Sequence, residues 1–366
     1  MLRQTLLCLL ACCISLPAWA LSVVFINPGK SDEIYWVTAS RAMEAAAKSL
    51  KIDLEILYAQ RQHPRVIEFA EHIIARPAAK RPDFVVFSND YGTGPELVRM
   101  FDEAGIKVFL AFSAFTGNDD RAAMGRPRAT YQHWLGSLEP RADEAGYHTA
   151  KALITAGRAA RLHGKDGKLH LLAIAGDRST PSSLRRNEGM RRAVAESGDV
   201  VLDQEVYGGW SREKAAEQSE WLYQRHPRAR LIWAGNDLMA FGAMDVWEKR
   251  GGKPGKDALF SGINTSSEAL AALRNGRLSA LSGGHFIAGA WSLVMLHDYA
   301  HGRDFAQDEG SELDVPMFAL FNARTAALFE QRYGSLNFDS VDFRRYSKVL
   351  NPKLKRYDFS FSQLLR

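Results

Sequence analysis

Polar and aromatic side chains recur directly after the apolar segments of this 366-residue chain. Indole rings can stack on a flat ligand, guanidinium groups can bind an oxygen bidentately, and amide or carboxylate groups can hydrogen-bond hydroxyls. These side-chain types therefore suit the capture of a small polar molecule. The candidates, in chain order, are Asp32, Glu33, Tyr35, Trp36, Asn89, Asp90, Phe112, Ser113, Arg185, Arg186, Trp210, Asn236, Asp237 and Asn264.

Each candidate taken alone is also typical of a turn or a helix start, because Asn, Asp and Ser favour those positions. A preference for turns and helix starts does not explain why all of these residues follow predicted strands. The carboxyl ends of parallel strands meet at one edge of a sheet, and that edge is where open α/β sheets bind ligands. We therefore expect the candidates to gather around one binding cleft.

The common catalytic and nucleotide-binding motifs are missing. The chain has no G-x-S-x-G, H-E-x-x-H or G-x-x-x-x-G-K-[ST] sequence. The loop at 87–94 contains Gly92 and Gly94, but Leu97 occupies the third glycine position of a dinucleotide loop. Asp32 and Glu33 are adjacent and lack the fixed separation of a glycosidase pair. We expect a binding protein, not an enzyme, with no cofactor and no metal.

Residues 1–20 have the pattern of a cleaved signal peptide. A short apolar run follows Arg3 and ends before Ala18-Trp19-Ala20, which fits an A-x-A cleavage site. The segment contains all three cysteines, Cys8, Cys12 and Cys13, so disulfides and thiolate chemistry are not expected in the mature chain. Cys12 leaves a lipoprotein signal open as an alternative.

The charge balance argues against nucleic acid as a partner. The formal net charge is only +5, and the body of the chain has no block of basic residues. The excess lies at 343–366, where basic residues alternate with aromatic ones. This tail could dock on a membrane protein or an anionic surface, or it could be a strap whose rings cover the second lobe while its charges face water.

Short apolar segments alternate with helical patterns along most of the chain, which indicates α/β architecture with parallel sheets covered by helices. The pattern occurs twice and predicts two similar lobes. Predicted strands cover 23–26, 54–58, 84–87, 108–112, 169–175, 200–207, 231–234 and 258–261. Predicted helices cover 35–50, 65–75, 96–104, 143–156, 183–197, 212–226, 238–250 and 267–275.

Four segments resemble type I periplasmic solute-binding proteins, the class of the ribose, galactose and autoinducer-2 receptors. They are the loop at 27–36, the helix start Leu184-Arg185-Arg186-Asn187-Glu188-Gly189-Met190, the run at 231–243, which is similar to A-x-N-D-x-M-A-x-G-A, and Gly262-Ile263-Asn264. The likeness extends from 23 to about 305. It implies stacking by Trp36 and Trp210, an arginine contact from Arg186 or Arg185, an amide contact from Asn236, and Asn264 at the usual aspartate position.

The departures from the family pattern concern polar contacts. Phe112-Ser113 stands where ribose-type binders carry an Asp-Arg pair, and Gly284 followed by His285 stands where they carry a hinge glutamine. His285 is therefore added to the candidates. The pocket is expected to be less charged and more aromatic than those of the ribose and autoinducer-2 receptors.

The resemblance also implies three crossovers between the lobes, near 133–141, 281–287 and 311–318. The predicted N-terminal lobe comprises 21–136 plus 285–312, and the C-terminal lobe comprises 137–284 plus 313–366 with the tail. We expect a periplasmic, monomeric protein that closes on a sugar or sugar-like ring and delivers it to a membrane ABC permease. The alternative is a sensory co-receptor for a membrane histidine kinase or cyclase, since both roles need only ligand-dependent closure.

Overall fold

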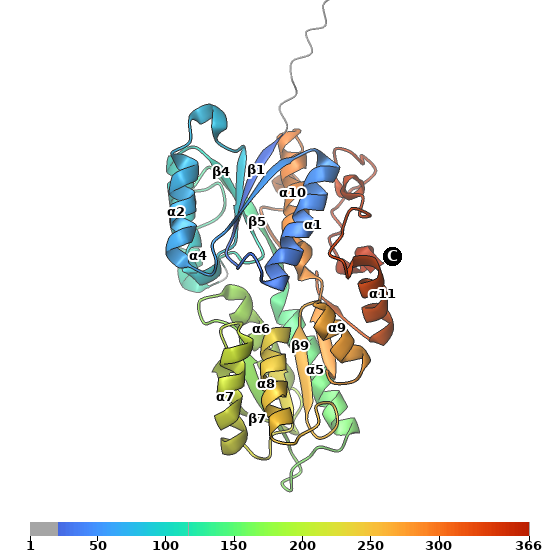
Figure 1. Cartoon of the computed structure of the whole chain (residues 1–366). Helices are drawn as coiled ribbons and strands as arrows, with labels where there is room; N and C mark the ends of the chain where they lie inside the picture. The colour runs from blue at the N-terminus through green and yellow to red at the C-terminus, as the bar shows by residue number, and fades with distance from the viewer. Residues whose placement is uncertain (1–20, 116, 366) are drawn as a thin grey trace, which may run out of the picture.

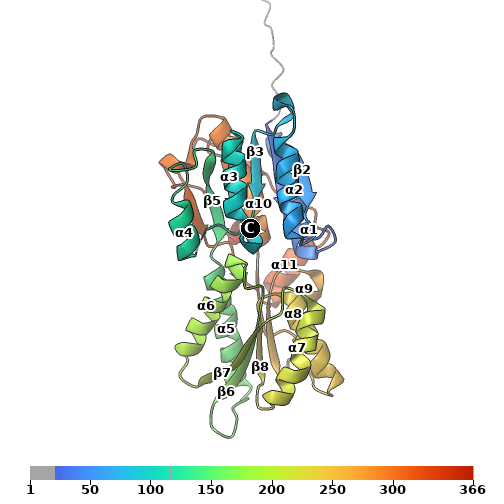
Figure 2. The ribbon, with the colours of Figure 1, turned by 90° about the vertical axis from the view of Figure 1, so that its left-hand side faces the viewer.

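The structure is a computed structural model that describes residues 21–115 and 117–365. The predicted signal segment 1–20 and its cysteines lie outside the described residues. The described chain forms two α/β lobes, which are stacked one above the other in Figure 1 and are seen from a second side in Figure 2. No helix in the described ranges combines the length and the apolar character needed to cross a membrane.

The first lobe contains a parallel six-stranded sheet in the order β11-β5-β4-β3-β1-β2. Successive residues of a strand point to opposite faces, and both faces of this sheet are covered, so its central strands β1, β3 and β4 are mostly apolar. In β1, Val23 and Phe25 pack with α1 and α10, whereas Val24 and Ile26 pack with α2 and α3. The strands are β1 Ser22–Asn27, β2 Asp53–Tyr58, β3 Phe84–Phe87, β4 Lys107–Ala111, β5 Trp134–Pro140 and β11 Glu312–Val315. The helices are α1 Ile34–Leu50, α2 His63–Ile74, α3 Gly94–Glu103, α4 Asn118–Met124 and α10 Ala288–Ala300.

The second lobe repeats this plan with the strand order β12-β10-β9-β8-β6-β7. All of its pairs are parallel except β12, which runs antiparallel to β10. Leu171 and Ala173 of β6 pack with α5 and α6, and Leu172 and Ile174 pack with α7 and α8 on the other face. The strands are β6 Leu169–Ala175, β7 Val200–Tyr207, β8 Leu231–Ala234, β9 Leu259–Ile263, β10 Ala280–Gly283 and β12 Ala319–Leu320. The helices are α5 Ala142–Ala159, α6 Pro181–Ala195, α7 Arg212–Arg225, α8 Asp237–Lys249, α9 Ser267–Arg274 and α11 Ala323–Tyr333.

The chain passes between the two sheets three times, after β5, after β10 and between β11 and β12. The predicted fold class, two helix-flanked parallel sheets, is therefore confirmed. The exact lobe boundaries stay a prediction, and two of them, at 136 and 312, fall inside strands that continue to Pro140 and Val315.

The C-terminal tail differs from the prediction, which assigned it to the second lobe alone. Helix α11 packs on α9 of the second lobe, but the short helix η5, Phe343–Tyr346, contacts α1 and α10 of the first. The aromatic rings of the tail are largely buried, and several of its basic side chains are exposed. It is a strap, as one of the two alternatives held, but it covers both lobes.

Helices α5 and α6 pack closely against each other, and glycines allow it. A Cβ atom on Gly146 would lie 1.9 Å from the carbonyl oxygen of Arg186, and one on Gly189 would lie 1.9 Å from that of Asp143. Real Cβ atoms do not approach a carbonyl oxygen so closely, so these two positions require glycine. This contact fixes the position of the first turns of α6 relative to α5, and those turns carry Arg186.

The close packing of α5 and α6 gives a prediction for Gly189→Ala. Alanine alone would favour a helix by about 1 kcal/mol, but the overpacking against Asp143 should outweigh this gain. We expect the free energy of unfolding in urea, followed by circular dichroism, to fall by about 1–3 kcal/mol. Glu188→Ala, at the exposed neighbouring position, should change it by less than about 0.5 kcal/mol. A Gly189→Ala protein as stable as the wild type would show that the helices can separate freely.

Candidate functional site

A cavity that is partly open to solvent lies between the lobes. Most of its lining residues lie just past the carboxyl ends of strands of both sheets, as expected for parallel α/β sheets. The lining residues are Glu33, Tyr35, Trp36, Arg61, Asp90, Phe112, Ser113, Pro140, Ala142, Thr180, Ser182, Arg186, Trp210, Asn236, Asn264, His285 and Phe318.

Trp36 closes the first-lobe side of the cavity as part of the core. It lies in the first turn of α1, and its ring covers Gly29 so closely that a Cβ there would lie 1.9 Å from the indole. The ring packs edge to face on Phe112 at 5.2 Å between centroids and on Tyr35 at 5.0 Å. Only 4% of Trp36 is exposed. This burial leaves an edge for a ligand rather than an open face for stacking.

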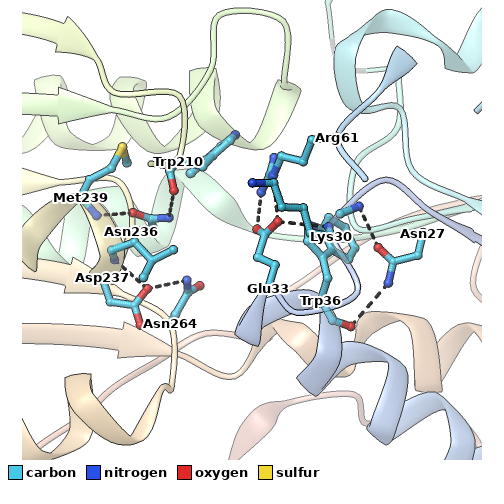
Figure 3. A network of polar contacts seen from close by, with 12 residues as sticks. Asn27, Lys30, Glu33, Trp36, Arg61, Trp210, Asn236, Asp237, Met239 and Asn264 are labelled. Carbon is cyan, nitrogen blue, oxygen red and sulfur yellow. Dashed lines mark hydrogen bonds and ion pairs between the residues drawn. The ribbon is translucent and has the colours of Figure 1, made fainter. Parts of the chain in front are cut away.

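An ion pair forms the polar part of the first-lobe wall (Figure 3). Arg61, which follows β2, donates from Nε to Glu33 Oε2 at 2.8 Å and from a second nitrogen to Glu33 Oε1. Its remaining terminal nitrogen donates to the hydroxyl of Tyr91 at 2.7 Å. Because Arg61 uses all three nitrogens on these partners, Glu33 is charge-compensated before a ligand arrives.

Asp90 is the second carboxylate of this wall. It accepts a hydrogen bond from the Ser88 hydroxyl at 3.1 Å, and it is 5% exposed. Burial raises the pKa of Asp90 to about 6, against the opposing effect of Arg61. The carboxylate is therefore ionised at neutral pH and can accept hydrogen bonds from ligand hydroxyls.

Arg186 is the central cation of the second-lobe wall. It is 4% exposed, and it donates to the Gly235 carbonyl at 2.7 Å and to His285 Nε2 at 2.9 Å. Its guanidinium carbon lies 5.3 Å from the Trp210 ring and 5.7 Å from the Phe318 ring. Nε of Arg186 is buried and has no hydrogen-bond partner within the described parts of the chain. Burial lowers the pKa of Arg186 to about 10, so the group stays charged at neutral pH.

His285 holds Arg186 from the second crossover. Because Arg186 donates to Nε2, the imidazole must be neutral with its proton on Nδ1. Burial, and next the charge of Arg186, lowers the pKa of His285 well below its usual value, which agrees with this tautomer. The ring is stacked between Tyr35 at 4.8 Å and Phe318 at 4.4 Å. This stack joins the first lobe to two crossovers.

Trp210 of the second lobe, like Trp36 of the first, packs its ring against a glycine. Its ring lies over Gly176, where a Cβ would be 2.3 Å from the indole. It is more exposed than Trp36, and it lines the cavity. Trp210, Phe112 and Asn264 all have positive φ, at 64°, 71° and 131°. Such angles cost energy in residues other than glycine and are often found at binding sites.

Asn236 and Asn264 complete the second-lobe wall (Figure 3). The Oδ1 of Asn236 caps α8 by accepting from the Met239 amide at 2.9 Å, and its Nδ2 donates to the Trp210 carbonyl at 3.4 Å. Asn264 donates to Asp237 Oδ1 at 2.8 Å, which leaves its own Oδ1 to face other donors. These bonds fix the orientation of both amides, so each presents a defined group to the cavity.

Four predicted contact residues do not line the cavity, and their assignment is corrected. Asp32 is exposed on the loop before α1. Asn89 is buried and organises its own turn, with Oδ1 accepting from the Gly94 amide at 2.9 Å. Asp237 accepts a hydrogen bond from the Asn264 side chain, and Arg185 points to the crossovers, where it pairs with Glu139.

Arg185 forms an ion cluster with acids of both lobes. It donates to Asp143 at 2.8 Å, to Asp314 at 2.8 Å and to Glu139 at 3.4 Å. Of the two neighbouring arginines, Arg186 is therefore the one that reaches the cavity. The remaining predicted residues line it, and their contact with a ligand stays a prediction: Glu33, Tyr35, Trp36, Asp90, Phe112, Ser113, Arg186, Trp210, Asn236, Asn264 and His285.

Several lining residues were not predicted. Arg61, Thr180 and Ser182 follow β2 and β6, so the rule that strand ends carry the site would have found them if it had been applied to every strand. Phe318 lies in the third crossover, where no local sequence signal marks it. Thr180 Oγ1 is buried without a hydrogen-bond partner among the described residues and adds another polar group to the wall.

The arrangement offers hydrogen bonds and ring contacts, and among the described lining residues no serine or threonine hydroxyl is hydrogen-bonded to a histidine or a carboxylate. Within 21–115 and 117–365, no group of three His, Cys, Asp or Glu side chains is placed to hold a metal ion. The carboxylate of Asp90, the amides of Asn236 and Asn264, the guanidinium of Arg186 and the face of Trp210 can together bind a polar ring.

The sequence matches known proteins over most of its length. Residues 23–304 match the family described as "Periplasmic binding protein domain". Among curated proteins, 95 residues are 32% identical to the ribose import binding protein RbsB of Bacillus subtilis, and 86 residues are 30% identical to the transcriptional regulator AscG of Escherichia coli. These alignments span 29% and 26% of the two relatives.

Solved structures resemble the whole chain. A periplasmic sugar-binding protein from Pseudomonas fluorescens is 38% identical, with a TM-score of 0.84 over 94% of this chain and 100% of that one. A solute-binding protein from Actinobacillus succinogenes with bound D-allose is 20% identical, with a TM-score of 0.69 over 84% of this chain and 99% of that one, and it shows the fold alone. The chain belongs to the periplasmic binding protein domain family.

Proposed function

We propose that this protein is a periplasmic binding protein that captures a neutral, polyhydroxylated ring, a sugar or a close analogue, and delivers it to an ABC importer. One observation carries the proposal. Arg186 lines the cavity beside the ring of Trp210, and its buried Nε–H has no hydrogen-bond partner among the described residues. A ligand oxygen would accept from this donor while the ligand ring stacks on the indole.

The opposite wall supplies the complementary groups. Ionised Asp90 accepts hydrogen bonds from hydroxyls, and Glu33 is already paired with Arg61. The site therefore combines one cationic donor with several acceptors, as a polyol needs, rather than two cations around a strong anion.

The relatives support the same class of ligand. The Pseudomonas fluorescens relative is described as sugar-binding, and the more distant structures include one with D-allose and an arabinose-transporter component from Shewanella with arabinofuranose. The D-allose and arabinofuranose structures are described as ABC transporter components, which favours delivery to an importer over the sensory alternative. Residues 1–20 would then act as a cleaved signal peptide, and the protein would work as a monomer with a membrane permease.

The proposal is tested by titrating the purified protein with D-allose, L-arabinose, D-ribose, D-galactose and myo-inositol. At least one of them should raise the melting temperature, because a ligand at 100 times its Kd stabilises the folded state by about 2.7 kcal/mol. Arg186→Gln should weaken the binding of that compound, measured by calorimetry, by about 10–100-fold, since a buried charged hydrogen bond contributes about 1.5–3 kcal/mol.

Trp210→Ala should weaken binding by about 10-fold through the lost ring contact. Trp221, exposed on α7 away from the cavity, provides the matched control, and Trp221→Ala should leave Kd unchanged. If no compound of this class binds, or if both site variants bind as tightly as the wild type, the proposed function is contradicted.

Binding should also depend on pH through Asp90. The pKa of Asp90 is raised to about 6, so its proton is bound as the pH falls through that value and one acceptor for ligand hydroxyls is lost. The Kd of the best compound should be constant from about pH 7 to 8 and should rise toward pH 5. Glu139, whose pKa burial raises to about 7, also titrates near this range, so the assignment needs a variant.

Asp90→Asn removes the titrating group while keeping an acceptor oxygen. The variant should lose most of the rise in Kd between about pH 7 and 5. A wild-type Kd that does not change with pH, or an Asp90→Asn Kd that rises as steeply, would show that ionised Asp90 takes no part in binding.

A further inference from the structure

We propose that residues 321–365 form a clasp that limits how far the two lobes open and that presets the second and third crossovers beneath the site. This segment is called the C-terminal clasp below. In Figure 1 it runs along one side of the molecule, from α11 beside α9 in the lower lobe to loops beside α1 and α10 in the upper lobe. The inference rests on hinge closure as proposed above, but it concerns the protein without ligand.

The clasp begins on the second lobe. The amide of Phe321 donates to the Leu281 carbonyl of β10 at 2.8 Å. Helix α11 then packs on α9, and Glu330 of α11 forms an ion pair with Arg274 of α9. Phe329 of α11 is 2% exposed and belongs to the core. This first part is therefore a fixed layer of the second lobe.

The clasp next crosses to the first lobe, where Asp298 of α10 anchors it. Asp298 is fully buried, and both of its oxygens accept hydrogen bonds from the clasp. The donors are the Ser347 hydroxyl, the Lys348 amide at 2.6 Å and the Tyr357 hydroxyl at 2.9 Å. A buried carboxylate is costly without such partners, so Asp298 and this part of the clasp depend on each other.

Two further contacts strengthen the attachment to the first lobe. The ammonium of Lys348, which is 1% exposed, forms ion pairs with Glu309 at 2.5 Å and Asp308 at 3.3 Å. The indole of Trp291 in α10 lies between rings of the clasp, parallel to Phe359 at 5.2 Å and tilted against Phe343 at 5.3 Å. These are core contacts, not the contacts of a loosely laid tail.

The clasp finally returns to the hinge. Two residues after Phe359, Phe361 packs on Phe329 at 5.7 Å, and the Tyr333 hydroxyl donates to the Leu364 carbonyl at 2.9 Å. The clasp therefore passes between the lobes twice, in addition to the three crossovers of the sheets. An opening that separates the attachment at Asp298 from α11 would have to stretch or detach these two passages.

Phe361 connects the clasp to the binding site. Its ring covers Gly284 so closely that a Cβ there would lie 2.4 Å from the ring and 2.7 Å from the carbonyl oxygen of Met317. Gly284 precedes His285, which holds Arg186, and Met317 precedes Phe318, which stacks on His285. Phe361 is thus a positioning residue that acts on the site through both crossovers, without lining the cavity itself.

The distance between the lobes tests this role. Lys30 and Glu213 are exposed on opposite sides of the cleft and close enough to interact electrostatically. Because every cysteine lies within 1–20, Lys30→Cys and Glu213→Cys place the only two spin labels in the mature chain. Electron paramagnetic resonance then measures the interlobe distance distribution of the protein without added sugar. We expect Phe361→Ala to broaden this distribution and move it to longer distances.

Phe101→Ala is the matched control, because Phe101 is also a fully buried phenylalanine but lies in the first-lobe core between the sheet and α3. It should lower the melting temperature without changing the distance distribution. Phe361→Leu, which keeps an apolar contact and folds with less loss, should shift the distribution in the same direction by a smaller amount. If both Phe361 variants give the wild-type distribution, the clasp does not limit opening. This outcome can be separated from a failure of sugar binding, since no sugar is present.

Discussion

The guanidinium of Arg186 is buried between the two lobes, and within 21–115 and 117–365 no carboxylate is hydrogen-bonded to it; the surrounding structure is arranged to make this possible. A buried cation is costly unless hydrogen bonds and dipoles replace its water. The Gly235 carbonyl, the neutral imidazole of His285 and the faces of Trp210 and Phe318 supply that replacement. The Nε–H has no hydrogen-bond partner among the described residues, and we have proposed that a ligand oxygen accepts from it.

This single side chain links all levels of the structure. The close packing of α5 and α6 fixes the position of the Arg186 backbone. The missing side chain at Gly176 leaves room for the ring of Trp210, which contacts the Arg186 guanidinium. His285 contacts Arg186 from the second crossover, and Phe318 contacts it from the third. All of these contacts to Arg186 therefore exist only when the lobes and crossovers have their observed arrangement. If a ligand binds beside Arg186 as proposed, binding and lobe closure would be coupled through the same contacts, as in other two-lobed proteins that close around ligands.

Much of the fold was predictable because both faces of each sheet are covered. Continuous apolar strands such as β3 and β8 are readable without knowledge of tertiary contacts. Strand β5 was missed because it contains Gly136, Ser137 and Pro140, and the two-residue strand β12 is too short for any pattern. The tail was placed on one lobe because its attachment to Asp298 depends on a residue of α10 that no local pattern connects with it.

The site was predictable to the extent that it follows the strand ends. Glu33, Arg186, Trp210 and Asn236 all line the cavity as that rule expects. The rule could not separate Arg185 from Arg186, because only the packing of α6 decides which one faces the cavity. It also could not show that Trp36 is mainly a core residue.

The most direct test of the account is a crystal structure of the protein with a bound sugar from the titration. The account predicts closed lobes, a sugar ring against the indole of Trp210, and a sugar oxygen within about 3 Å of Nε of Arg186. A sugar bound elsewhere, or one bound in the cleft with Nε of Arg186 still unpaired, would contradict it.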